Sequence, residues 1–110
     1  MKTLKFTDSL SKLILNNEKN TTWRLFDDKN LTVGDIIKFI NKNTQKEFAT
    51  TKIISIKETT FSNLTKKDWE GHEKFDSEKE MYDTYSRYYK QKVTKDTPVK
   101  VIKFEIISFI

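Results

Sequence analysis

Alternating apolar and polar positions predict a series of strands along this chain. The clearest case is the C-terminal segment Val99–Ile110, where apolar residues at alternate positions are separated by charged ones, a pattern typical of a half-buried strand. Four earlier segments of similar pattern or composition predict further strands: Thr3–Phe6, Thr21–Phe26, Ile36–Ile40 and Phe48–Thr59. The chain is therefore expected to be rich in β-structure.

Three helices are expected between these strands. The first begins at Thr7 or Asp8, either of which can cap it, and has an apolar face at helical spacing: Leu10, Leu13 and Ile14. Two further starts, at Thr65 and Ser77, match the capping-box spacing. In that motif the hydroxyl of the first residue and the carboxylate of the fourth satisfy free backbone amides.

Two segments raise the question of which side chains enter the core. The last helix would place Met81, Tyr85 and Tyr88 on one face, a stripe more typical of core packing than of a base-stacking platform. In the long strand before the helices, the pairing register decides which isoleucines are buried: Ile54 and Ile56, or Ile53.

The order of the elements predicts an α+β fold. Consecutive strands with short polar connections favour a mostly antiparallel sheet, curled or closed into a small β-barrel, with helices that plug or flank it. A doubly wound parallel fold is excluded because regular strand–helix alternation is absent. The length of 110 residues is close to the commonest domain size, so we expect a single domain over residues 1–110.

Composition removes several classes of function. The absence of cysteine excludes disulfide scaffolds, thiolate nucleophiles and cysteine-bearing zinc sites. The single histidine, His72, lies in a polar loop where we expect it at the surface, and it leaves no imidazole pair for a metal cluster. No apolar run approaches the ~20 residues of a membrane span. We expect a cytoplasmic protein with no cofactor, no metal and no membrane partner, monomeric by default.

The net charge of +5 is unevenly distributed. Residues 1–55 hold ten Lys/Arg against six Asp/Glu, whereas Leu64–Asp83 holds four Lys against seven Asp/Glu. A basic surface attracts polyanions and supports nucleic-acid binding. The same composition is also explained by solubility and by genome bias, so charge alone leaves both interpretations open.

The segment between Lys19 and Arg24 carries the densest candidate chemistry. Alternate side chains of a strand share a face, so Thr22 and Arg24 would point together, and Thr21 and Trp23 would point away. Lys19 would curl over the face of Thr22 and Arg24, where the two cations would clamp a phosphate or a carboxylate. The alternative is an exposed strand end with Trp23 buried.

Taken in order, the motifs of the chain resemble those of the ASCH domain family. The resemblance covers roughly residues 4–109 and rests on the order and spacing of these motifs: Lys19-x-x-Thr22-x-Arg24, Val33-Gly34-Asp35, the long strand after Phe48, Phe61-x-x-Leu64-Thr65, Gly71-His72-Glu73-Lys74-Phe75 and Val99-x-Val101-Ile102-x-Phe104. The resemblance implies a PUA-like β-barrel, a cleft lined by the Lys/Thr/Arg segment, and roles connected with RNA.

One branch of the family that this chain resembles hydrolyses the acetamide of N4-acetylcytidine with a Lys, a Thr and a Glu. Lys19 and Thr22 match the first two without gaps. The Glu matches Glu73 if one residue is inserted nearby, whereas an ungapped alignment places His72 there. The resemblance implies Thr22 as nucleophile and Lys19 as its base, provided that burial or Arg24 disfavours the charged amine. Glu73 would protonate the leaving amine.

Three functions remain open. Our first expectation is a module that binds RNA or a nucleoside, with an affinity that falls steeply with salt and with these ligand-binding residues: Lys19, Thr22, Trp23 and Arg24. The alternative is a small amidohydrolase that deacylates a modified nucleoside such as N4-acetylcytidine, with these catalytic residues: Lys19, Thr22 and Glu73. The third is a protein-interaction domain that uses the acidic segment Leu64–Asp83.

Overall fold

A computed structural model describes residues 2–26 and 29–109 of the chain. The strands and helices follow one another in this order: β1 (Lys2–Phe6), α1 (Asp8–Leu15), β2 (Thr21–Arg24), β3 (Ile36–Asn41), β4 (Lys46–Thr60), the 3₁₀ turn η1 (Phe61–Asn63), α2 (Lys66–Trp69), α3 (Glu78–Tyr89) and β5 (Pro98–Phe109). Each predicted strand is present, with ends that differ by one or two residues, and a helix begins at each of the three predicted starts. Ile110, which we had included in the last strand, lies outside the described residues.

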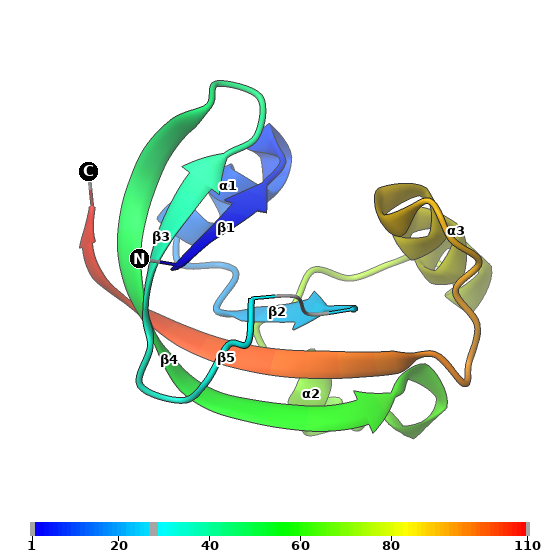
Figure 1. Cartoon of the computed structure of the whole chain (residues 1–110). Helices are drawn as coiled ribbons and strands as arrows, with labels where there is room; N and C mark the ends of the chain where they lie inside the picture. Colours follow the sequence, from blue (N-terminus) through cyan, green and yellow to red (C-terminus); the bar gives the residue numbers. More distant parts are fainter. Residues whose placement is uncertain (1, 27–28, 110) are drawn as a thin grey trace.

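The five strands form one curled sheet in the order β1-β3-β4-β5-β2. Only the β1–β3 pair is parallel, and the other three pairs are antiparallel. The long strands β4 and β5 pair along most of their length, with register shifts at two places, and both bend strongly (Figure 1). Because bulges increase bend and twist, the sheet curls into a half-barrel. The predicted α+β class and mostly antiparallel curled sheet are confirmed.

Local capping explains where the helices begin. Thr7, and not Asp8, is the N-cap of α1, and its hydroxyl accepts from the amide of Leu10. Thr65 forms a complete capping box with Asp68 at the start of α2. The hydroxyl of Ser77 accepts from the amide of Glu80 at the start of α3.

The first core lies between α1 and the sheet. Its buried side chains are all apolar: Leu4, Phe6, Ile14, Leu31, Ile37, Phe39, Phe48, Ala49, Ile53, Ile102 and Phe104. Ile53 is buried while Ile54 is 53% exposed, so β4 adopts the register that buries Ile53. Ile56 is half-buried at the margin of this core.

The second core lies between α3 and the β2–β5 part of the sheet. Its buried side chains are Trp23, Leu25, Phe61, Met81, Tyr85, Val93, Val99 and Val101. The predicted packing stripe of α3 is therefore correct for Met81 and Tyr85. It is wrong for Tyr88, which is 45% exposed. The reason is that α3 covers the sheet with only part of its circumference, and Tyr88 falls at the edge of the covered part.

Candidate functional site

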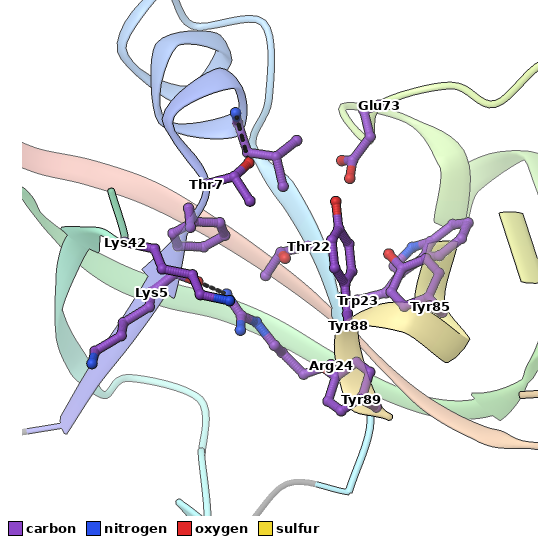
Figure 2. A pocket seen from close by; sticks show the side chains of 12 residues that line it. Lys5, Thr7, Thr22, Trp23, Arg24, Lys42, Glu73, Tyr85, Tyr88 and Tyr89 are labelled. Atoms are coloured by element: carbon purple, nitrogen blue, oxygen red, sulfur yellow. Dashed lines mark hydrogen bonds between the residues drawn. The ribbon is translucent and has the colours of Figure 1, made fainter. Parts of the chain in front are cut away.

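A cavity of about 240 Å³ lies at the seam between the two cores (Figure 2). It is bordered by β1, the start of α1, β2, the loop after α2, and α3. Twelve residues line it: Lys5, Phe6, Thr7, Leu10, Thr22, Trp23, Arg24, Lys42, Glu73, Tyr85, Tyr88 and Tyr89. The lining therefore combines tyrosine rings with cationic, acidic and hydroxyl groups.

Strand β2 divides its side chains between the cavity and the second core. Thr22 and Arg24 lie on the cavity side, as the strand alternation predicts. On the other side, the Thr21 hydroxyl donates to the carbonyl of Glu70 at 2.6 Å, and Trp23 Nε1 donates to the carbonyl of Asp68 at 3.2 Å. Within the described ranges, the hydroxyl of Thr22 has no hydrogen-bond partner, so it is available to a ligand.

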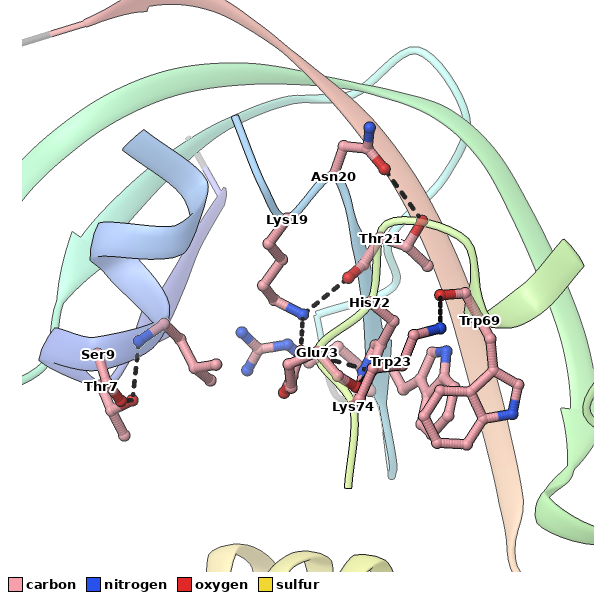
Figure 3. A network of polar contacts seen from close by, with 12 residues as sticks. Thr7, Ser9, Lys19, Asn20, Thr21, Trp23, Trp69, His72, Glu73 and Lys74 are labelled. Carbon is pink, nitrogen blue, oxygen red and sulfur yellow. Dashed lines mark hydrogen bonds and ion pairs between the residues drawn. The ribbon is translucent and has the colours of Figure 1, made fainter. Parts of the chain in front are cut away.

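Lys19 is paired with Glu73 and not exposed for anion binding. Its ammonium donates to Glu73 Oε1 at 2.5 Å and to the carbonyl of Thr21 at 2.7 Å (Figure 3). The Lys19 side chain is 1% exposed and that of Glu73 is 15% exposed. Burial lowers the pKa of Lys19 to about 8, against the opposing effect of the Glu73 carboxylate. Of the two residues that the sequence alignment left open, Glu73 and His72, it is Glu73 whose side chain pairs with Lys19.

The loop that carries Glu73 is locked to the start of β2. The backbone amides of Asn20 and Thr21 both donate to the carbonyl of Gly71, at 2.9 and 3.1 Å. Gly71 has a φ of 76°, a conformation that favours glycine. A Cβ atom at this position would lie 1.7 Å from Asn20 Oδ1. A glycine is thus required for the close approach that places Glu73 beside Lys19.

The expectation that His72 lies at the surface is wrong. The residue is 4% exposed, and its ring stacks on Trp23 with a centroid distance of 3.8 Å and an interplanar angle of 18°. His72 Nδ1 lies 2.8 Å from the carbonyl oxygen of Glu73, and Nε2 lies 3.1 Å from Tyr85 Oη. A carbonyl only accepts, so Nδ1 carries the proton and the Tyr85 hydroxyl donates to Nε2. Burial lowers the pKa of His72 to about 2.

Arg24 bridges the two edge strands of the sheet. Its Nη2 donates to the carbonyl of Lys5 at 2.9 Å, and its guanidinium lies 4.6 Å from the ring centroid of Phe6. Its Nε is buried and has no hydrogen-bond partner. Burial lowers the pKa of Arg24 from its ordinary value, yet an arginine side chain remains charged at neutral pH. Arg24 is thus a cation in the cavity wall that forms no ion pair with a carboxylate of the described residues.

The described part of the chain contains neither a candidate metal site nor a membrane-spanning helix. Residues 2–26 and 29–109 contain no group of three or more His, Asp or Glu side chains placed to hold a metal ion. The described helices are all too short or too polar to cross a membrane.

The family model of the ASCH domain matches residues 1–108, so the chain belongs to the ASCH domain family. This family is associated with nucleic acids. No functionally curated protein matches the chain.

Solved structures support the same fold. Protein EF3133 from Enterococcus faecalis is 10% identical, with a TM-score of 0.78 over 99% of this chain and 77% of its own. An ASCH domain from Lactobacillus crispatus is 14% identical, with a TM-score of 0.70 over 94% of this chain and 72% of its own. The hypothetical protein PH0355 is 25% identical, with a TM-score of 0.71 over 97% of this chain and 100% of its own.

The structure brings together the residues that the sequence singled out. Thr22, Trp23, Arg24 and Glu73 all border the cavity, and Lys19 lies behind Glu73. Trp23 borders the cavity although it belongs to the second core and is only 2% exposed. The sequence analysis missed the rest of the lining, above all these residues: Lys5, Lys42, Tyr88 and Tyr89. The helical spacing of Met81, Tyr85 and Tyr88 could have pointed to Tyr88, whereas no sequence pattern pointed to Lys5 or Lys42.

Proposed function

We propose that this chain binds a single nucleoside, free or as one residue of an RNA strand, in the cavity at the seam of the two cores. The observation that carries the proposal is the cavity itself, with its volume of about 240 Å³ and its lining of tyrosines and hydrogen-bonding groups. Pockets for drug-sized ligands measure about 300–1,000 Å³. A cavity just below that range suits one base with part of its sugar.

Each part of the cavity offers a contact that a nucleoside uses. The half-exposed ring of Tyr88 supplies a face on which a base can stack. The Thr22 hydroxyl both donates and accepts, and the Arg24 guanidinium donates to oxygen acceptors of the ligand. Lys19 acts indirectly, because its ammonium is directed to Glu73 and to the carbonyl of Thr21. Its contribution is to hold the Glu73 carboxylate in the cavity wall.

Amide NMR spectra of labelled protein test this proposal. Cytidine, N4-acetylcytidine and a short single-stranded RNA are added separately, and shifts are followed residue by residue. We expect saturable shifts at Thr22, Arg24 and Tyr88, with the RNA effect weakening as salt is raised. The proposal fails if none of these three ligands shifts the cavity residues.

A matched pair of aromatic substitutions separates stacking from general surface effects. Tyr88→Leu removes an exposed ring from the cavity, and Phe109→Leu removes a ring that is 62% exposed and lies outside it. We expect Tyr88→Leu to weaken binding by about tenfold, because base–aromatic stacking contributes about 1–3 kcal/mol. Phe109→Leu should leave the affinity unchanged.

A second function, hydrolysis of an N-acylated nucleoside, is favoured by one further observation. The Glu73 carboxylate, which is paired with Lys19, lines the same cavity as the Thr22 hydroxyl, and this hydroxyl has no partner among the described residues. A hydroxyl nucleophile needs a base that is unprotonated near the working pH, which for a lysine means the neutral amine. The pKa of Lys19, lowered to about 8, makes the neutral amine accessible.

The reaction would proceed through an acyl-enzyme. Transfer of one proton from Lys19 to Glu73 turns the ion pair into a neutral amine and a carboxylic acid. Thr22 Oγ1 then attacks the acetamide carbonyl carbon while its proton passes to Lys19. The C–N bond breaks as Glu73 gives its proton to the leaving amine, and water later releases acetate from Thr22, which regains its proton.

Release of acetate from N4-acetylcytidine tests this second function. Thr22→Val keeps the shape of the side chain and removes the hydroxyl, so we expect acetate release to stop even at nucleoside concentrations that saturate the variant. If Thr22→Val hydrolyses the acetamide as fast as the parent protein, the assignment of the nucleophile is wrong. If neither protein releases acetate but both bind, the chain is a binding module alone.

A further inference from the structure

Charge is distributed unevenly around the cavity. One side holds Glu73, whose carboxylate is engaged by Lys19. The other side holds Arg24 with the lysines Lys5 and Lys42 (Figure 2). Within residues 2–26 and 29–109, neither Lys5 nor Lys42 forms an ion pair. The cavity therefore has a neutralised inner side and a cationic side that lacks counter-ions.

Backbone hydrogen bonds hold the three cationic residues at one place. The end of β1 is the common element: the carbonyl of Phe6 accepts from the amide of Lys42 at 2.7 Å. The neighbouring carbonyl of Lys5 accepts from Arg24 Nη2 at 2.9 Å. Lys5, Arg24 and Lys42 are thus gathered around the end of β1 and all line the cavity, although the three residues are far apart in the sequence.

Among the described residues, the acidic group closest along the chain to the end of β1 does not neutralise these cations. Asp8 lies in the first turn of α1, and its carboxylate accepts from Lys12 Nζ at 3.0 Å and from Asn41 Nδ2 at 2.9 Å. No carboxylate in residues 2–26 and 29–109 forms an ion pair with Arg24 either, and its Nε is buried without any hydrogen bond. Like charges on one side of a cavity create a positive field, which attracts an anion to that side.

We propose that Lys5, Arg24 and Lys42 form a phosphate site at the mouth of the cavity, and that the ligand is a phosphorylated nucleoside. This inference rests on the proposed nucleoside binding. The base lies toward Glu73 and Tyr88, and the phosphate lies on the cationic side. A guanidinium matches phosphate oxygens with paired N–H donors, and lysines add mobile point charges. The phosphate belongs to a free nucleotide or to the backbone of an RNA strand.

Isothermal titration calorimetry tests the inference with matched ligands. The four common ribonucleosides and N4-acetylcytidine are each titrated with and without a 5′-phosphate, at low salt. A trinucleotide series without terminal phosphates supplies the backbone arm. The test variant is Lys5→Gln with Lys42→Gln. The control is Lys92→Gln with Lys95→Gln, which removes the same charge from two exposed lysines outside the cavity.

We expect the phosphate to increase affinity by about tenfold in the parent protein and in the control, because hydrogen bonds between charged partners are the strong ones. In the test variant this advantage should disappear while nucleoside affinity stays the same. If the test variant loses affinity only for the monophosphates, the natural ligand is a free nucleotide. If it loses affinity only for the trinucleotides, the phosphate belongs to an RNA backbone. Thermal unfolding of both variants shows whether each is folded.

Two results would count against the inference in different ways. If nucleosides bind, but neither monophosphates nor trinucleotides lose affinity in the test variant, the phosphate site is wrong and nucleoside binding stands. If no nucleoside, nucleotide or RNA binds the parent protein, the proposed function itself is wrong and the phosphate site falls with it.

Discussion

The two cores of this protein differ in what they bury. In the first core phenylalanine rings meet directly, with Phe39 at 4.7 Å from Phe6 and 4.8 Å from Phe104 between centroids. The polar side chains buried beside these rings are neutral: Ser11 and Thr51, both of which donate to backbone carbonyls. The second core and the cavity beside it instead bury ionisable groups: Lys19, Asp68 and His72.

Burying ionisable groups is costly unless each finds a partner. Here each does: Lys19 meets Glu73, Asp68 accepts from Lys57 at 2.9 Å, and His72 bonds to Tyr85. A buried ion pair contributes less to stability than apolar packing of the same volume, so its presence beside a cavity points to chemistry or recognition. The first core stabilises the sheet, and the second core shapes the cavity and fixes its polar groups.

The largest effect that this contrast predicts is on the first core. Phe39 is 1% exposed and touches three other phenylalanine rings, so Phe39→Ala should lower the free energy of unfolding by about 3–5 kcal/mol. Urea denaturation measures the loss. The control is Phe109→Ala, a ring 62% exposed, which should change stability by no more than about 0.5 kcal/mol. Similar losses in the two variants would contradict the assignment of the first core.

The next effect concerns the loop that carries Glu73, and the chain provides a matched control. Gly71 and Gly34 have φ values of 76° and 91°, so alanine is strained at both. At Gly34 nothing lies within 4 Å of an added Cβ, whereas at Gly71 the side chain of Asn20 lies in its way. Gly34→Ala should cost about 1–2 kcal/mol from backbone strain alone.

Gly71→Ala should cost more than Gly34→Ala, because Asn20 must also move. It should in addition displace Glu73 and weaken ligand binding, which Gly34→Ala should leave intact. Urea denaturation and calorimetry on both variants make the comparison. Equal losses of stability, with binding retained in both, would show that the loop does not depend on its close contact with β2.

Sequence patterns correctly predicted the local features of the fold, which depend only on residues close together in the chain. The strand alternation placed Thr22 and Arg24 on one face, and the hydroxyls of Thr7, Thr65 and Ser77 marked the helix starts, because a strand period and a cap are properties of a few consecutive residues. Such features need no knowledge of the rest of the fold.

The remaining features depend on the curl of the sheet. β1 and β2 are the two outer strands in the sheet order, yet Arg24 reaches the carbonyl of Lys5. Only that closure brings Lys5 to the cavity. The burial of His72 likewise depends on α3 and β2 enclosing the loop from two sides, since its ring contacts both Trp23 and Tyr85. A lone histidine between polar neighbours gives no sign of either.

A subtler prediction compares the buried Lys19–Glu73 pair with an exposed pair of the same type. The Glu73 carboxylate raises the pKa of Lys19 against the effect of burial. Glu73→Gln should therefore lower this pKa further below about 8. The control is Asp83→Asn on α3, where Asp83 raises the pKa of exposed Lys79. Solvent screening should make that change smaller. NMR titration of the lysine side chains measures both.

The sign of the stability effect follows from the same shift. The folded chain releases the Lys19 proton near pH 8, whereas the unfolded chain holds it to about pH 10.5. Between these values the unfolded state binds more protons, so this group makes the fold more stable as pH rises. Glu73→Gln should extend to lower pH the range over which Lys19 makes the fold more stable as pH rises. A Lys19 pKa that stays the same or rises in Glu73→Gln would contradict the direct pairing.

The smallest expected effect is that the His72 ring does not titrate in the folded protein. Burial lowers its pKa to about 2, so its ring should show no titration by NMR between pH 8 and pH 5, with the proton on Nδ1 throughout. The unfolded chain takes up this proton near pH 6.5, so the fold should lose stability as pH falls from 7 to 5, a range that lies above the titration of ordinary carboxylates. His72→Gln should reduce that loss. A ring that titrates near pH 6.5 in the folded protein would mean that the second core admits water, and the contrast between the two cores would no longer hold.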